Sequence, residues 1–509
     1  MSTEAPRADT VVTETVEPAG EVWVAETELR AGTLGLTGAI MQNVTHIAPA
    51  IAAFFFTPTL VGFAGAHSPL AYLIGFLIVL ALGSCLVQLA RLFPSAGGYF
   101  TYVSRTVHPR AGFLTGWAYT FYSPIVTGPI VAFFGFILEG ELKANYSFTF
   151  PWWLFTALAL AVITALAYLG IRLSVRTVVI LGALEFLIVL ALGLSGLASP
   201  GPGGFTFSSF DPGFNPGGIA TASGFTLAVV FTVQGLTGWE AAVPLAEETE
   251  NPRRNISIAT LASIVIVGLM LIVVIWGQVI GWGVDDLTKL TESDELPALV
   301  IAHRVWSGAW PFALFAMFTS VMAASLACTN VATRMWFGMG RAGALPKAVA
   351  TVDPVRKVPV VALAVQTLIS AALGLALAGA FGPDKIFVLT VGFCLVIAVI
   401  FVYVMANLGV VLHYWRERRS EFNWLLHFVF PVGTSAILIY SLIKSFSPFP
   451  ASPYNWSPAI VGGWLLAGVA ILVIMRLRGD EDWLERAGEI VDERPETADE
   501  LAHLHADRV

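Results

Sequence analysis

The sequence predicts an all-α integral membrane protein with about twelve transmembrane helices, two of which are broken near their middle. The first observation behind this prediction is composition. Of 509 residues, 56% are hydrophobic and only 12% are charged, whereas soluble domains carry about 25% charged residues. The second is that apolar runs repeat at the length of about 20 residues that a bilayer requires. The third is that polar residues and glycines interrupt two of these runs at membrane depth.

Applying that length along the chain gives twelve expected spans, each separated from the next by a polar or charged connection. They are 34–63, 69–92, 113–138, 152–171, 176–198, 218–247, 257–281, 309–337, 359–380, 386–412, 424–446 and 458–476. We expect one twelve-helix domain over 34–476. The flanking segments, 1–33 and 477–509, are strongly acidic, and we expect them to be disordered, solvated tails.

The distribution of lysine and arginine predicts the orientation of these spans, because cytoplasmic connections carry an excess of positive charge. If both tails are cytoplasmic, only five of the 27 lysines and arginines lie outside: Lys143, Lys289, Arg304, Lys385 and Lys444. Adding or removing one span breaks this bias. We therefore predict a multi-pass protein of the cell membrane with cytoplasmic N- and C-termini.

The first span is interrupted by a polar stretch followed by proline. Proline fits poorly inside a helix but suits the first turn of a new one. We therefore expect half-helices over 34–43 and 49–56, and the alternative is one continuous helix kinked at Pro49. The polar residues in this stretch are candidates to contact an ammonium group or a bound cation: Gln42, Asn43, Thr45 and His46. His46 could also titrate near neutral pH.

The sixth span contains a second break, where an apolar run ends and polar and glycine residues follow. Each glycine weakens a helix by about 1 kcal/mol relative to alanine, and no water is present in hydrocarbon to satisfy the freed backbone groups. The break should therefore line a cavity or bind a solute, as discontinuous helices of secondary transporters do. Its residues are Gln234, Gly235, Thr237, Gly238 and Glu240.

The two breaks lie five spans apart. An inverted repeat of five spans would place corresponding elements at that interval. The sequence thus predicts two inverted halves of five helices each, followed by two extra helices.

Two carboxylates lie inside predicted spans and away from their ends. Glu185 follows Arg176 by nine residues, which places it about 13 Å deep. A lone carboxylate there costs several kcal/mol unless it is paired, hydrated or protonated, so Glu185 could take up and release a proton; a structural hydrogen bond is the alternative. Glu240 could likewise carry a proton, pair with a basic solute group, or cap the second half-helix.

Five short motifs together resemble the amino acid–polyamine–organocation transporters over about residues 34–476. They are FPSAGGYFTY at 93–102, GFLTGW at 112–117, GWEAA at 238–242, AEETENPRR at 246–254 and RAGALP at 341–346. The resemblance implies the five-plus-five fold with two appended helices. It also implies an amino acid or related amine as substrate, held between broken spans one and six.

In that family, a glycine-rich turn of the first span offers backbone N–H groups to the substrate carboxylate. The corresponding residues here are Pro49, Ala50 and Ile51. The glycines are missing and proline has no N–H, so the resemblance implies capture by the N–H groups of Ala50 and Ile51 at a helix N-terminus. An aromatic that often gates the family's site is replaced by Gln234, so the pocket could be more polar than is usual in the family, or Phe231 or Trp239 could gate it instead.

These features predict a secondary active transporter, or permease, that works by alternating access as a proton symporter. Sodium symport remains open because Ser320, Ser325 and Thr329 could supply ligands; solute exchange and a non-transporting sensor remain open as well. An enzyme is not expected, since no catalytic motif or nucleophile–base set is present. Beyond the solute, the proton and lipid, we expect no cofactor, metal or nucleic acid.

Overall fold

The computed structural model describes residues 29–293 and 295–489, and all helices and bridges below refer to this part of the chain. Of the two predicted tails, only 29–33 and 477–489 are among these residues. The expected disorder of 1–28 and 490–509 lies outside the described residues. Regular structure here is helical, and the two isolated β-bridges join Leu34 to Thr249 and Val352 to Pro359.

Nine helical runs within the described residues are long and apolar enough to cross a membrane. They are Leu36–Leu92, Pro109–Tyr146, Ile171–Ala198, Pro252–Trp282, Pro311–Arg341, Val360–Phe381, Pro383–Arg416, Leu425–Ser445 and Tyr454–Arg478. Two shorter apolar helices are Trp152–Tyr168 and Ala222–Gly235. Each of these elements overlaps one or two predicted spans, which confirms an all-helical, multi-pass membrane protein.

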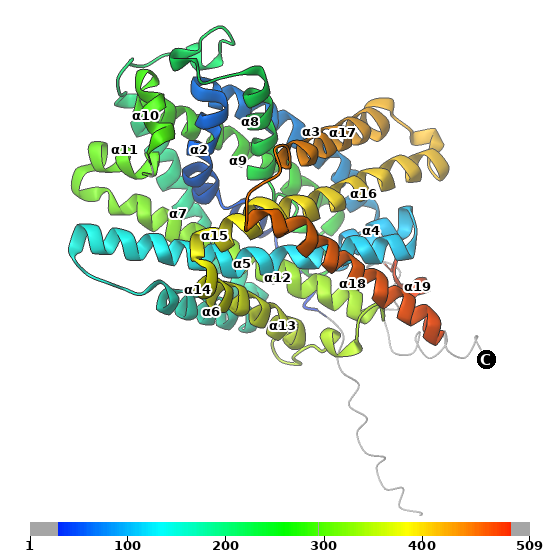
Figure 1. Cartoon of the computed structure of the whole chain (residues 1–509). Coiled ribbons are helices and arrows are strands. Elements are labelled where there is room, and N and C mark those ends of the chain that lie inside the picture. Colours follow the sequence, from blue (N-terminus) through cyan, green and yellow to red (C-terminus); the bar gives the residue numbers. More distant parts are fainter. Residues whose placement is uncertain (1–28, 294, 490–509) are drawn as a thin grey trace, which may run out of the picture.

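The first half of the chain contains nine named α-helices (Figure 1). They are α1 (Leu36–Ile47), α2 (Pro49–Ala64), α3 (Ser68–Leu92), α4 (Tyr99–Thr106), α5 (Pro109–Tyr146), α6 (Trp152–Tyr168), α7 (Ile171–Ala198), α8 (Ala222–Gly235) and α9 (Pro252–Trp282). The short helix α4 follows the glycine-bearing connection after α3.

The second half adds ten α-helices, several of which run on from π-helical turns. They are α10 (Leu287–Glu292), α11 (Pro297–Trp306), α12 (Pro311–Arg341), α13 (Val360–Ala371), α14 (Ala378–Phe381), α15 (Pro383–Phe387), α16 (Leu395–Arg416), α17 (Phe430–Ser445), α18 (Ser457–Arg478) and α19 (Trp483–Arg486). The π-helical segments are η8 (Ala372–Leu377), η9 (Val388–Cys394) and η11 (Leu425–Val429).

The core forms where α3 packs on α9, α5 packs on α12, and α7 packs on both α9 and α12. Helix α18 lies beside α5 at the periphery (Figure 1), where the Trp117 and Trp464 rings stack with centroids 4.3 Å apart. Each indole N–H also donates to the other residue's carbonyl, at 2.7 and 2.8 Å. Helices α1 and α2, which flank the first break, pack against α7, α9 and α12 of this core.

The first break is narrower than the sequence predicts. Helix α1 continues to Ile47, and Ala48 alone leaves helical geometry, at φ +56° and ψ +67°. Helix α2 then begins at Pro49, whose fixed φ suits a first helical turn. The expected end of the first half-helix at Asn43 is therefore wrong. The polar side chains nearby find partners within folded structure: Gln42 bonds to α12, Asn43 to the second break and Thr45 to its own helix.

The second break is wide. Helix α8 ends at Gly235, residues 236–242 form turns, and η4 (Val243–Glu248) continues as a 3₁₀-helix. Gly238 has φ +117°, and a Cβ there would lie 2.7 Å from Nδ1 of His46 and 2.8 Å from its carbonyl oxygen. Only glycine permits that approach. The two breaks, almost 200 residues apart, therefore touch each other.

Candidate functional site

A cavity of about 50 Å³ lies between the two breaks. The end of α1 and the start of α2 form one wall, the end of α8 forms another, and α5, α12 and α16 complete it. Its lining residues are His46, Ile47, Ala48, Ile51, Ala52, Phe56, Tyr122, Val126, Ile130, Gln234, Gly235, Thr237, Ala324, Val391 and Leu395. A volume of this size holds one or a few water molecules.

Five of the predicted solute-contacting residues line this cavity: His46, Ile51, Gln234, Gly235 and Thr237. Phe231 lies one layer further out, with its ring 4.8 Å from that of Phe56, a lining residue. Gly238 does not line the cavity but packs against His46, which does. The structure therefore brings the centres of both predicted breaks together around one hollow.

The polar residues earlier in α1 lie elsewhere and bind other parts of the protein. The Gln42 side chain donates to the carbonyl of Ala327 at 3.0 Å. Asn43 Oδ1 accepts the backbone N–H of Ala242 at 2.6 Å and so satisfies part of the second break. Thr45 donates to the carbonyl of Met41 within its own helix at 2.8 Å. None of the three lines the cavity, so solute contact by them stays a prediction.

His46 is buried at the end of α1 and lines the cavity. Its Nδ1 lies 3.3 Å from the hydroxyl of Tyr122, and the two rings meet edge to face with centroids 5.1 Å apart. Within the described part of the chain its Nε2 has no hydrogen-bond partner. An unpartnered buried ring nitrogen is available to a bound solute.

Ala50 and Glu185 form the contact that the sequence does not reveal. The backbone N–H of Ala50, in the first turn of α2, donates to Oε1 of Glu185 on α7 at 2.7 Å. Glu185 is fully buried, and Ser320 of α12 is its other polar neighbour. A carboxylate at a helix N-terminus is favoured by the helix dipole and by the free N–H groups there.

Glu240 is buried among tyrosine hydroxyls. Its Oε1 accepts hydrogen bonds from Tyr403 of α16 at 2.8 Å and from Tyr119 of α5 at 3.4 Å. Its Oε2 makes no hydrogen bond to any described residue. The ring of Tyr99 packs 5.0 Å from that of Tyr119, and Trp239 packs 5.4 Å from Tyr403. Glu240 therefore joins the second break to α5 and α16.

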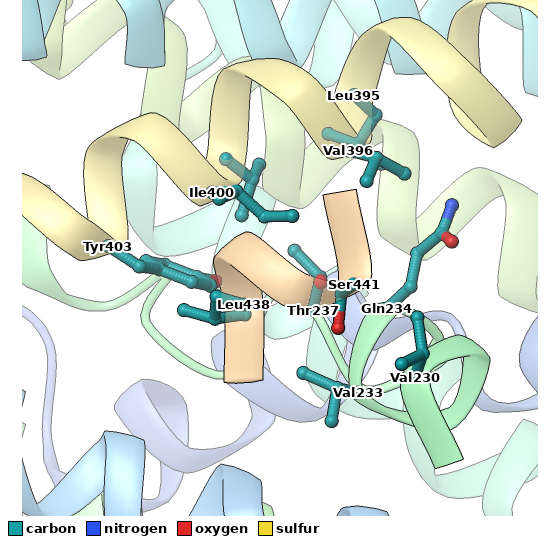
Figure 2. Close-up of a pocket in the computed structure, with 11 residues that line it drawn as sticks. Val230, Val233, Gln234, Thr237, Leu395, Val396, Ile400, Tyr403, Leu438 and Ser441 are labelled. Atoms are coloured by element: carbon teal, nitrogen blue, oxygen red, sulfur yellow. The ribbon is translucent and has the colours of Figure 1, made fainter. Parts of the chain in front are cut away.

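A second, smaller cavity of about 20 Å³ lies on the other side of the α8 break, between α8, α16 and α17 (Figure 2). Gln234 and Thr237 line both cavities. The Gln234 side-chain nitrogen donates to the carbonyls of Gly392 at 3.1 Å and Val391 at 3.3 Å. These carbonyls belong to the π-helical segment η9, a feature often found at functional sites.

Sequence reasoning missed the aromatic half of the site, namely Phe56, Tyr119, Tyr122 and Tyr403. A usable signal existed for two of them: Tyr119 and Tyr122 lie three residues apart in one span, hence on one helix face. Buried phenol groups usually find a hydrogen-bond partner. A contact between these tyrosines and an embedded carboxylate could therefore have been predicted.

Two ion pairs join η4, which follows the second break, to α12, and the pair of Glu248 with Arg334 is the fully buried one. Glu248 binds Arg334 of α12 through two bonds of 2.8 and 3.1 Å, and Glu247 binds Arg341 through two bonds of 2.8 and 2.7 Å. The nearby Arg253 donates to the carbonyl of Arg91 at 2.6 Å.

The family model described as "Amino acid permease" matches residues 38–483. The low-affinity putrescine importer PlaP of Escherichia coli (strain K12) is 23% identical over 410 residues, covering 77% of this chain and 83% of PlaP. The aromatic amino acid transport protein AroP of the same strain is 26% identical over 309 residues, covering 59% and 64%. The gamma-aminobutyric acid permease of Bacillus subtilis (strain 168) is 25% identical over 363 residues, covering 67% and 71%. These relatives are transporters and not enzymes.

Proposed function

The chain belongs to the amino acid permease family, and on that premise we propose that it is a secondary active transporter that moves an amino acid or a related amine across the cell membrane. Transport proceeds by alternating access and is coupled to proton symport. The observation that carries this proposal is the single cavity onto which both helix breaks open. Breaks at membrane depth are tolerated where they line a cavity.

The proposed architecture has twelve spans, with cytoplasmic termini and two inverted halves of five helices. Three observations support it. The breaks fall in the first and sixth predicted spans. The run Leu36–Leu92 contains α1, α2 and α3, which is enough for two spans, and α6 and α8 are apolar but short. With this topology, 22 of the 27 lysines and arginines fall on the cytoplasmic side, as the positive-inside rule predicts.

Glu185 is the proposed proton-carrying residue, and Glu240 is the second candidate. Support for Glu185 comes from its position, since it links α7 to α2 at the first break and has Ser320 of α12 beside it. A proton gained there would weaken the bond to Ala50 and so alter how α2 is held against α7. Binding of a proton would thereby be linked to movement of the helices around the cavity.

One observation supports sodium as the coupling ion. The hydroxyls of Ser320 and Ser325 on α12 are buried, and neither makes a hydrogen bond to a described residue. Hard cations are bound by oxygen ligands. Sodium symport is therefore the first alternative to proton symport that should be tested. The same scaffold would also suit a solute exchanger or a non-transporting solute sensor.

Uptake into proteoliposomes tests the proposal. Radiolabelled putrescine, 4-aminobutanoate, phenylalanine and lysine are offered in turn, with no gradient, with an inward proton gradient, and with an inward sodium gradient. Accumulation driven by the proton gradient is expected. Accumulation driven only by the sodium gradient would show that sodium, and not the proton, is the coupling ion. Uptake that occurs only when the vesicles are preloaded with solute would show that the protein is an exchanger. Absence of flux with every solute would overturn the transporter proposal.

A further inference from the structure

The N-terminus of α2 has little capacity left for a solute. Pro49 has no N–H to donate, and the N–H of Ala50 already binds Glu185 at 2.7 Å. The N–H of Ala52 bonds to the carbonyl of Ala48 at 2.8 Å. In the first turn of the helix only the N–H of Ile51 is left. The place that a carboxylate of the solute would need is therefore held by a carboxylate of the protein itself.

A second carboxylate beside Glu185 would be unfavourable. Two like charges in a site of low polarity repel each other, and both would lose hydration. No compensating cation is at hand, because none of the described residues that line the cavity is a lysine or an arginine. The only titratable groups among them are His46 and Tyr122.

The remaining polar groups of the site suit an ammonium group. The Gln234 amide nitrogen is engaged with two carbonyls of η9, which leaves its side-chain oxygen as an acceptor. His46 lines the cavity, and its Nε2 has no hydrogen-bond partner among the described residues. Aromatic rings of Phe56 and Tyr122 face the same space, and ring faces attract cations.

We propose that the transported solute is an organic amine cation that carries no carboxylate group. A carboxylate is excluded because Glu185 of α7 already occupies the N-terminus of α2. This inference rests on the proposed transporter function and narrows its substrate class. The solute's ammonium group binds where the cavity offers acceptors and aromatic rings. Amino acids are poor substrates, because the N–H of Ala50 is already engaged by Glu185 and no lysine or arginine lines the cavity to receive a carboxylate.

Three probes of related skeleton, one without a carboxylate and two with one, test the inference. The amine 1,4-diaminobutane has none, ornithine is the same skeleton with one added, and 4-aminobutanoate has one in place of an aminomethyl group. In proteoliposomes containing the full chain, we expect the apparent affinity for 1,4-diaminobutane to exceed that for either other probe at least about tenfold. Transport of ornithine or 4-aminobutanoate with equal or higher affinity would overturn the inference and leave the transporter proposal standing. No transport of any amine or amino acid would instead overturn the transporter proposal.

Variants of Glu185 separate its blocking role from proton coupling. Downhill exchange is measured, because it does not require the proton gradient. Glu185→Ala frees the N–H of Ala50, so the preference for 1,4-diaminobutane over ornithine should fall to about threefold or less. Glu185→Gln keeps a side-chain oxygen that can accept the same N–H but removes the charge, so the preference should fall less than in Glu185→Ala.

Folding is controlled by comparing the size-exclusion profile of each variant with that of Glu292→Ala, which alters an exposed residue of α10. If Glu185→Ala is monodisperse and keeps the wild-type preference, the inference is wrong. If it does not fold, Glu185→Ser, which has a shorter side chain, is measured in its place with the same two readings.

Discussion

The backbone N–H of Ala50 donates a 2.7 Å hydrogen bond to Oε1 of Glu185, which lies 135 residues later in the chain. This bond ties the first turn of α2, directly after the first break, to the middle of α7. Both groups are buried. A buried backbone donor and a buried carboxylate each cost free energy when left alone, so each stabilises the other here.

Replacing Glu185 with glutamine should abolish uptake driven by a proton gradient while leaving solute binding within about twofold of wild type. Glutamine can still accept the N–H of Ala50 but cannot gain or lose a proton. Uptake is measured with and without the gradient, and binding is measured by equilibrium titration. Glu292→Gln, at an exposed site, is the matched control. A variant that still accumulates solute at the wild-type rate would show that Glu185 does not carry the proton.

Replacing Gly235 with leucine should weaken solute binding at least about tenfold. A Cβ at this position would lie 2.7 Å from Cδ2 of Phe56, so a larger side chain drives that ring into the cavity it lines. Gly235→Ala should have the same effect to a smaller degree. Gly62→Leu is the control, since a Cβ at Gly62 meets no described atom within 4 Å. Wild-type affinity in Gly235→Leu would refute the placement of the solute between the breaks.

Replacing Arg334 with methionine should lower the free energy of unfolding by about 3–5 kcal/mol, because Glu248 is left as an unpaired buried charge. Both side chains are at most 1% exposed. The double variant Arg334→Met with Glu248→Gln should recover much of the loss. Thermal unfolding of the detergent-solubilised protein measures both effects. A single variant as stable as wild type, or a double variant less stable than the single one, contradicts the prediction.

Removing the hydroxyl of Tyr403 should cost more stability than removing that of Tyr119. Their bonds to Glu240 measure 2.8 and 3.4 Å, and the shorter one is the stronger. We expect a loss of about 1–3 kcal/mol for Tyr403→Phe and a smaller one for Tyr119→Phe, each measured by unfolding in detergent. Tyr440→Phe, on the exposed side of α17, serves as the control. The reverse order would mean that Tyr119 is the main partner of Glu240.

The sequence alone determined the membrane character, the position of the helical runs and the existence of both breaks. These are local properties. A run of about 20 apolar residues has to cross a bilayer wherever it lies, and a proline or a pair of glycines weakens a helix without help from elsewhere. For the same reason, His46, Gln234 and Thr237 could be chosen as candidates from their neighbours in the chain.

Only the tertiary structure decided which polar groups meet. Gln42 bonds to the carbonyl of Ala327 and Asn43 to the N–H of Ala242, and the acids Glu248 and Glu247 pair with arginines of α12. The physical reason is that these bonds join helices far apart in sequence. Their partners are set by how the helices pack, which no local pattern of residues records, and the bond from Ala50 to Glu185 is a further instance.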